Sequence, residues 1–193
     1  MNYLPSITRE LIAEMPPEVF PGQIIVVDRP ADVAKALGCL EASGRVGFDT
    51  ETRPNFSKTD HHKVCLIQVS TEHVCYLFRL NRLGGVPASL KGFLENRQII
   101  KIGLSLLDDF HALRKLTSID PEGFIDLQKF VQPFGIQESS LRKIYAILFG
   151  RKISKRAQLS NWEAETLTVA MQQYAALDAW ACLRIYQHLI LHP

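Results

Sequence analysis

The chain alternates short apolar stretches with segments of helical spacing, and this alternation constrains its fold more than any other feature. Stretches rich in β-branched residues occupy 23–28, 45–51, 63–70, 73–80 and 97–103, and a shorter candidate strand lies at 124–128. Helical spacing marks 31–43, 87–96, 106–116, 139–150 and a long segment near 167–190. Strands that alternate with helices predict an α/β fold. The adjacent stretches at 63–70 and 73–80 predict a hairpin, so we expect a mixed sheet.

Residues 1–22 precede the first expected strand and have a different character. They contain a short helical segment that Pro16 and Pro17 end, and they lack the basic region followed by an apolar run that marks a secretory signal. We therefore expect an N-terminal lead-in over 1–22 and one domain over 23–193.

Composition excludes some classes of protein. Hydrophobic residues make up 47% of the chain and charged residues 22%, as in an ordinary globular domain. The net charge of +2 argues against a polybasic nucleic-acid binder, so any basic patch must be local. No apolar run reaches the roughly 18 residues that would span a bilayer, so we expect no membrane partner. The four cysteines form no C-x-x-C pair, which favours buried free thiols and a cytoplasmic protein.

Two acidic residues, Asp49 and Glu51, follow the apolar run Val46-Gly47-Phe48. Side chains two apart on a strand point to the same face. Two like charges about 4 Å apart repel by about 4 kcal/mol at an effective dielectric of 20, so something must offset the repulsion. A magnesium or manganese ion would do so, because these ions prefer oxygen ligands. The alternative is a solvated loop that carries two surface acids.

A second acidic pair, Asp108 and Asp109, follows the expected strand at 97–103 and falls in the first turns of the next helix. Either residue could complete a metal site. Either could instead be a favourable helix-start residue, because the helix dipole stabilises negative charge there.

The third acidic feature is Asp178, which lies four residues after Tyr174 and hence on the same face of the long helix. That face also carries Met171 and Cys182, so we expect it to be buried. A buried carboxylate is costly unless it is paired or bound to a metal. The alternatives are an ion pair with an arginine or the capping of a loop.

Basic residues are concentrated in two stretches. Residues 151–156 hold Arg151, Lys152, Lys155 and Arg156, of which Lys155 and Arg156 are our candidate substrate contacts; a solvated loop is the alternative. Residues 53–63 add Arg53, Lys58, His61, His62 and Lys63, with Phe56 as a candidate for stacking on a base. Paired histidines also suit zinc, but no cysteine or third histidine lies nearby in the sequence. We interpret Trp162 as a packing anchor rather than a stacking platform.

Joined in order, the three acidic motifs resemble the DEDD superfamily of 3′–5′ exonucleases, in the subgroup that carries a tyrosine. The matching stretches are FDTE (Asp49, Glu51), KIGLSLLDDFHALRK (Asp109) and YAALDAW (Tyr174, Asp178). KVCLIQVS and LSNWE support the match, which resembles the Werner-type and ribonuclease D-type domains over about residues 23–190. By register Asp109 is the second-motif residue, and Asp108 is the alternative.

The resemblance implies a ribonuclease H-like core, with a five-stranded mixed sheet flanked by helices. It also implies removal of nucleotides from the 3′ end of DNA or RNA with two divalent cations, Mg²⁺ or Mn²⁺. Asp49 would contact both ions, Glu51 and Asp178 would hold one, and Asp109 would support the other. Tyr174 would orient the attacking water, because a phenol with a pKa near 10 is a poor base at neutral pH; a core tyrosine is the alternative.

Two other functions stay open. One is a ribonuclease H-like endonuclease, against which the tyrosine-bearing helix argues. The other is a nucleic-acid-binding module with weak or no catalysis, which the occupied acidic positions disfavour. The sequence does not choose between DNA and RNA and does not reveal an oligomeric state.

Overall fold

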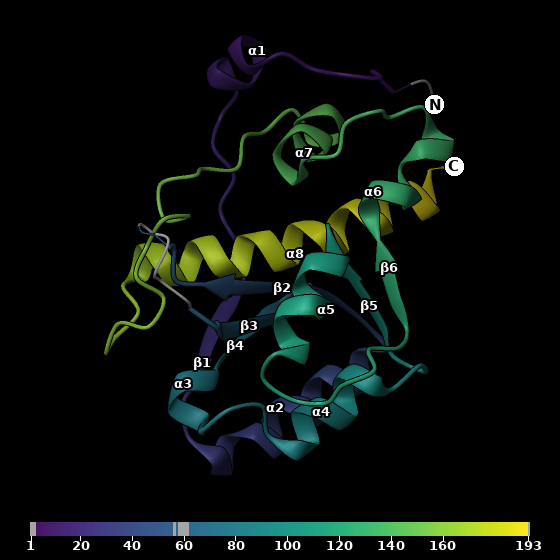
Figure 1. The fold of residues 1–193 in the computed structure, drawn as a ribbon. Coiled ribbons are helices and arrows are strands. Elements are labelled where there is room, and N and C mark those ends of the chain that lie inside the picture. Colours follow the sequence, from purple (N-terminus) through teal and green to yellow (C-terminus); the bar gives the residue numbers. More distant parts are fainter. Residues whose placement is uncertain (1–2, 56, 58–61, 193) are drawn as a thin grey trace.

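The computed structural model describes residues 3–55, 57 and 62–192, and its centre is a mixed β-sheet (Figure 1). Within these residues the sheet has six strands in the order β1-β4-β3-β2-β5-β6. The strands are β1 (Gln23–Val27), β2 (Arg45–Thr52), β3 (Val64–Ser70), β4 (Val74–Arg79), β5 (Ile100–Gly103) and β6 (Phe124–Asp126). The five-stranded sheet that we expected from the resemblance is therefore wrong by one strand. The observed fold still belongs to the α/β class, and its sheet is mixed as predicted.

Strand direction brings the carboxyl ends of β2 and β5 to one edge of the sheet. β2 pairs in parallel with β5, and β5 pairs in parallel with β6. β3 is antiparallel to both β2 and β4, so it is the strand that runs against the others. The acidic residues of β2 and those that follow β5 therefore lie near the same edge, where open α/β sheets bind ligands.

Helices cover both faces of the sheet (Figure 1). They are α1 (Arg9–Glu14), α2 (Pro30–Ser43), α3 (Leu80–Leu83), α4 (Ala88–Glu95), α5 (Leu106–Arg114), α6 (Leu127–Phe130), α7 (Leu141–Phe149) and α8 (Val169–Leu191), with a 3₁₀ turn at Gln132–Phe134. Side chains of α7 and α8 form one hydrophobic core, and those of α2, α4 and α5 form the other on the opposite face. No helix of the described chain is both long and apolar enough to cross a membrane.

The long helix α8 lies directly on β2 and sets the geometry of the site. A Cβ atom added to Gly47 would lie 1.8 Å from the carbonyl oxygen of Ala179, so no side chain fits there. The helix begins after Thr168, whose hydroxyl accepts a hydrogen bond from the amide of Met171 at 3.3 Å. This close packing fixes which turn of α8 faces the end of β2.

The N-terminal segment packs on α7 through α1, and its Phe20 joins the core between the sheet and α8. Ile7 and Ile12 form a small core with Ala146 of α7. Arg151 donates to the carbonyl oxygen of Pro17 at 3.2 Å, and Lys152 donates to that of Ala13. The boundary between lead-in and domain at residue 22 stays a prediction.

The expected elements differ from the observed ones mainly at their ends. β5 begins at Ile100, three residues later than expected, and His73 belongs to the hairpin loop and not to β4. Pro87 precedes α4 as its N-cap, and α3 was not expected. All four cysteines are free, but Cys39 is exposed, against the expectation of buried thiols.

Candidate active site

Three carboxylates from two distant parts of the chain meet at the end of β2. Asp49 and Glu51 project from the same face of this strand, and Asp178 comes from α8, where it is only 7% exposed. Each of the three offers an oxygen that lies within 4.8 Å of the other two. Because these are all hard oxygen ligands, the cluster suits a divalent cation such as Mg²⁺ or Mn²⁺.

Asp109 approaches the cluster from α5 but is not one of these three carboxylates. Its Oδ1 accepts a hydrogen bond from the hydroxyl of Thr50, which lies between Asp49 and Glu51 in β2. Asp108 is exposed and lines a different pocket, beside Phe110 and Phe124. The structure therefore turns Asp109 toward the cluster and Asp108 away from it.

The first turn of α5 is held by Asp126 at the end of β6. The carboxylate of Asp126 accepts hydrogen bonds from the backbone amides of Ser105 at 3.3 Å and Leu106 at 3.0 Å. Ser105 has φ of 59°, a conformation that non-glycine residues rarely adopt. These contacts fix where α5 begins and therefore where Asp109 points.

Burial and mutual repulsion disfavour the charged forms of the acids. Burial raises the pKa of Asp49 well above its ordinary value, and the charges of Asp109 and Asp178 act in the same direction. Burial raises the pKa of Glu51 to about 10, and the charge of Asp49 adds to the effect. Burial also raises the pKa of Asp109 and of Asp178 to about 7. Such a cluster is costly without a positive charge, and cations would supply one.

Tyr174 stands one helical turn before Asp178 and is hydrogen-bonded to it. Burial and then the charge of Asp178 raise the pKa of Tyr174 above its ordinary value, so its hydroxyl stays protonated at neutral pH. Its ring lies 6.0 Å from that of Trp162, which is fully buried. Trp162 is thus a packing anchor, as expected.

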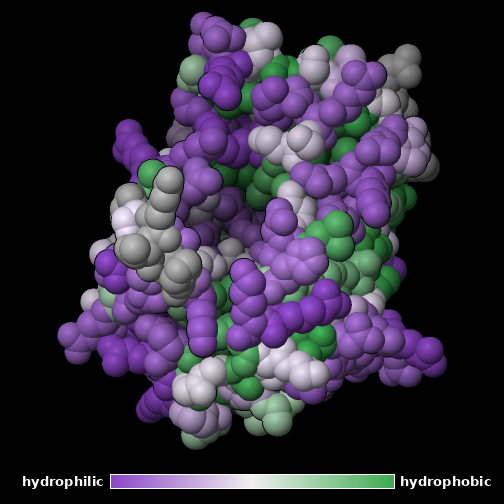
Figure 2. All heavy atoms as spheres, in the orientation of Figure 1, coloured by the Kyte–Doolittle hydropathy of each residue, from purple (hydrophilic) through white to green (hydrophobic). Residues whose placement is uncertain are grey.

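The three acids open into a pocket of about 370 Å³, which we call the acidic pocket. Its other walls include Arg142 of α7, Lys155, Gln158 and Tyr174. The charge of Arg142 lowers the pKa of Asp178, against the larger effect of burial. Figure 2 shows that the face turned to the viewer is hollowed near its middle, with hydrophilic residues around much of the hollow.

The four basic residues of 151–156, which the sequence suggested for phosphate binding, lie in different surroundings. Lys155 lines the acidic pocket, but Arg156 does not. Arg151 and Lys152 contact the lead-in, so the expectation that all four form one phosphate-attracting stretch is not met.

The stretch after β2 is only partly described. Arg53 and His62 lie 3.3 Å and 3.4 Å from carboxylate oxygens of Glu163. Phe56, Lys58 and His61 lie outside the described residues, so stacking by Phe56 stays a prediction, and the zinc site that we disfavoured at His61 and His62 is not tested. Among the residues that are described, the acidic trio is the group with metal-binding geometry.

The loop before α8 is anchored to the sheet by Arg79, which is 3% exposed. Its guanidinium donates to the carbonyl oxygen of Glu165 at 2.7 Å and to that of Ala164. Arg82 adds a third bond, to the carbonyl oxygen of Glu165 at 3.0 Å. Because this loop carries Trp162 and Lys155, the anchor also fixes the wall of the acidic pocket.

Sequence reasoning missed three residues at this site: Thr50, Gln68 and Arg142. Thr50 sits inside the first motif, and its position between the two acids was a usable signal. Gln68 pairs with Asp49 across the sheet, and an isolated amide in the apolar run at 63–70 could have drawn attention. Arg142 lies in a helix that the sequence presented only as amphipathic, and no local signal connects it to the acids.

Comparison with known proteins agrees with this geometry. A family model described as 3′–5′ exonuclease matches residues 24–192, so the chain belongs to the 3′–5′ exonuclease family. It is 31% identical over 179 residues to the mouse bifunctional 3′–5′ exonuclease/ATP-dependent helicase WRN; this covers 88% of the chain but only 13% of the mouse protein.

Solved structures share the fold. The EXO domain of Aedes aegypti Nibbler matches with a TM-score of 0.77 and 23% identity, covering 89% of this chain and 90% of that one. Escherichia coli RNase D matches with a TM-score of 0.77 and 21% identity, covering 88% of this chain and 44% of that one. The ribonuclease H-like α/β fold that we predicted is confirmed.

Proposed function

We propose that this protein is a 3′–5′ exonuclease that hydrolyses nucleotides one at a time from the 3′ end of DNA or RNA, with two divalent cations as cofactors. The observation that carries the proposal is the meeting of Asp49, Glu51 and Asp178 within 4.8 Å, in a chain of the 3′–5′ exonuclease family. The three acids, of which Asp178 is buried, repel one another when they are charged, so a cation-binding function explains their presence.

We assign the cation ligands from their positions. Asp49 lies between the other acids, because the charges of both Asp109 and Asp178, after burial, raise its pKa. Asp49 would therefore contact both ions. Glu51 and Asp178 would complete one site, and Asp109 would support the second. When bound, Mg²⁺ or Mn²⁺ supplies charge that stabilises the developing phosphorane-like charge and makes water more acidic.

The remaining side chains would bind and orient. Tyr174, whose protonated hydroxyl is hydrogen-bonded to Asp178, would orient a water beside the scissile phosphate. Lys155 and Arg142, which also line the acidic pocket, would attract the phosphate backbone. Thr50 holds the carboxylate of Asp109 in place through its hydroxyl.

An end-labelled oligonucleotide incubated with Mn²⁺ tests the reaction. We expect a ladder that shortens from the 3′ end and stops when that end carries a phosphate in place of its hydroxyl. Asp49→Ala should abolish the ladder and leave binding largely intact. Internal cuts would instead indicate a ribonuclease H-like endonuclease, and a mobility shift without cleavage would indicate a binding module. Matched DNA and RNA strands assayed in parallel decide the sugar preference.

We also propose a cytoplasmic location, which rests on the cysteines alone. All four are free, and Cys65, Cys75 and Cys182 are buried. Burial raises the pKa of the Cys65 thiol to about 12, which keeps it unreactive. Alkylation of lysates under native conditions followed by mass spectrometry should find Cys39 reduced in cells; an oxidised Cys39 would argue for another compartment.

A further inference from the structure

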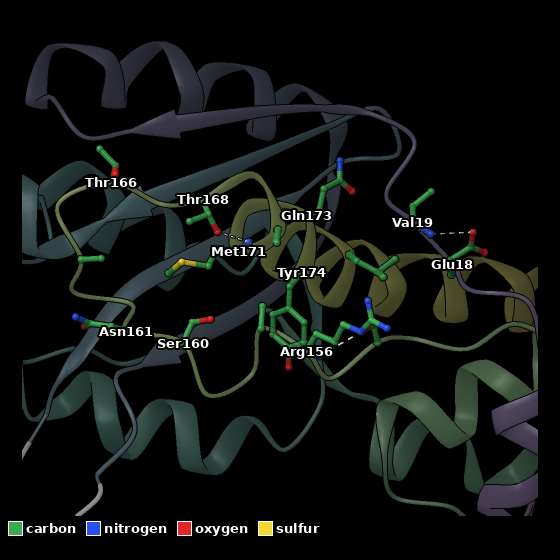
Figure 3. A pocket seen from close by; sticks show the side chains of 15 residues that line it. Glu18, Val19, Arg156, Ser160, Asn161, Thr166, Thr168, Met171, Gln173 and Tyr174 are labelled. Atoms are coloured by element: carbon green, nitrogen blue, oxygen red, sulfur yellow. Dashed lines mark hydrogen bonds between the residues drawn. The ribbon is translucent and has the colours of Figure 1, made fainter.

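A second cavity, of about 460 Å³, lies beside the acidic pocket and shares Tyr174 with it. Its walls are the first turns of α8, the loop before that helix, and Glu18 and Val19 of the lead-in (Figure 3). We call it the second pocket. Its volume falls in the range of pockets that bind small molecules.

A thin partition separates the two pockets. Along residues 153–158, Ile153, Lys155 and Gln158 line the acidic pocket. Ser154, Arg156 and Ala157 line the second pocket. The neighbouring basic residues Lys155 and Arg156 therefore serve different pockets, and with Tyr174 this short segment is the wall between them.

The lining combines apolar surface with uncharged polar groups. Met171, Leu177 and Ala157 are buried side chains in the wall, and Ser160, Asn161 and Thr166 add hydroxyl and amide groups. The carboxylate of Glu18 is already engaged, because it accepts hydrogen bonds from Arg184 and Tyr145, both at 2.8 Å. The second pocket thus contains no carboxylate that lacks a partner. Its apolar walls and uncharged polar groups suit a neutral, largely flat group with polar edges.

Two polar groups at the second pocket lack partners among the described residues. The Oε1 atom of Gln173 is buried and makes no hydrogen bond there. A buried acceptor without a partner is destabilising, and a hydrogen-bond donor of a ligand would recover that loss. The guanidinium of Arg156 makes no ion pair or hydrogen bond with the described residues, and it carries the positive charge that a phosphate would need.

We propose that the second pocket binds a nucleoside 5′-phosphate unit, with the base on the apolar wall, Gln173 on the base edge and Arg156 toward the phosphate. A base supplies a flat apolar face and amide-like edge groups, which is what this lining matches. The source of the unit is either a nucleotide of the substrate strand or a released mononucleotide. The link to catalysis rests on the proposed function, but binding itself does not.

Calorimetric titration of the full chain with AMP and with CMP, in EDTA, tests the binding. Without metal, phosphate binding at the acidic pocket is disfavoured by its carboxylates, so the second pocket is measured alone. We expect saturable binding of both nucleotides and none of ribose 5-phosphate, which lacks the base. No saturable binding of either nucleotide, or equal binding of ribose 5-phosphate, would overturn the proposal.

Variants locate the binding. Ala170 is exposed on the rim of the second pocket, so Ala170→Trp should fill the pocket without disturbing the core and weaken binding at least tenfold. Gln173→Leu should weaken it several-fold. Gln158→Ala, on the other side of the partition, is the matched control and should bind AMP as the parent does. Binding that survives both Ala170→Trp and Gln173→Leu would place the nucleotide elsewhere and refute the site.

Steady-state degradation of an oligonucleotide separates the two sources. A raised KM with unchanged kcat in Ala170→Trp means that a base of the strand occupies the second pocket. An unchanged KM with loss of inhibition by AMP means that the released nucleotide does. If neither changes although AMP binding is lost, the link to the acidic pocket is wrong. If the parent degrades nothing but binds AMP in EDTA, the proposed function fails and the second pocket stands.

Discussion

Gln68 lies directly opposite Asp49 in the antiparallel pairing of β2 and β3. It is fully buried, and neither its amide nitrogen nor its amide oxygen has a hydrogen-bond partner among the described residues. Directly opposed residues have Cβ atoms about 5 Å apart on the same face, so this amide lies beside the central acid of the cluster. We infer that Gln68 is a positioning residue that steadies Asp49 when cations are bound.

The first prediction concerns Gln68→Leu. Removing an unpaired buried amide should leave the free energy of unfolding in EDTA unchanged or raise it by about 1 kcal/mol. The same change should lower kcat about tenfold, because the polar side chain opposite Asp49 is replaced by an apolar one. Chemical denaturation and 3′-end degradation measure the two effects. Gln68→Glu is the control, and a further acid at this fully buried position should cost about 3 kcal/mol. A large loss of stability in Gln68→Leu would show that the amide is satisfied in the protein.

The second prediction is the pH dependence of the metal-free protein. Glu51, with a pKa of about 10, and Asp109 and Asp178, with pKa values of about 7, bind protons more tightly when folded than unfolded. The folded state then holds more protons above pH 4, so stability falls as pH rises. In EDTA we expect the Tm to drop by several degrees between pH 5 and pH 8.

Mn²⁺ should reverse this trend, because the carboxylates bind cations in their charged forms. The rise in Tm on adding Mn²⁺ should be larger at pH 8 than at pH 6. Glu51→Gln is the matched control, with a shallower slope in EDTA and a smaller response to Mn²⁺. A metal-free Tm that rises across this window would contradict the raised pKa values.

The third prediction ranks the two aspartates of α5. Asp109→Asn should lower kcat at least a hundredfold, because this carboxylate contacts Thr50 and lies toward the cluster. Asp108→Asn, at an exposed position of the same helix turn, should change kcat less than threefold and serves as the control. Single-turnover degradation with Mn²⁺ measures both variants. The reverse ranking would move the second-motif residue to Asp108.

The spacing of residues along the chain predicted the arrangements that involve side chains of a single strand or a single helix. The alternation of strand residues places Asp49 and Glu51 on one face, and the helical spacing places Tyr174 beside Asp178; the structure has both arrangements. Strand and helix positions followed from the same periodicities. The resemblance implied five strands, whereas the apolar stretches included a sixth candidate at 124–128, which the structure has as the three-residue strand β6 paired with β5.

The rest depends on contacts between distant segments, which periodicity does not encode. Arg151 and Lys152 look like phosphate-binding residues in sequence, yet carbonyl groups of the lead-in more than 130 positions away engage them. The segment that directs Lys155 and Arg156 to different pockets begins at Ile153, whose carbonyl oxygen accepts a hydrogen bond from Arg142 of α7 at 2.7 Å. Such tertiary hydrogen bonds satisfy main-chain acceptors and leave no regular pattern in the sequence.

The last prediction tests the packing that delivers Asp178 to the cluster. Gly47→Ala would place a methyl group 1.8 Å from the carbonyl oxygen of Ala179, so α8 or β2 must move. We expect a loss of about 3 kcal/mol in the free energy of unfolding, at the upper end for overpacking, and a loss of most activity because Asp178 shifts with α8. Gly38→Ala is the control, because Gly38 is exposed in α2 and an added Cβ meets nothing within 4 Å; it should stabilise the protein by about 0.5–1 kcal/mol. Equal effects of the two substitutions, measured by urea denaturation, would mean that α8 does not approach β2 this closely.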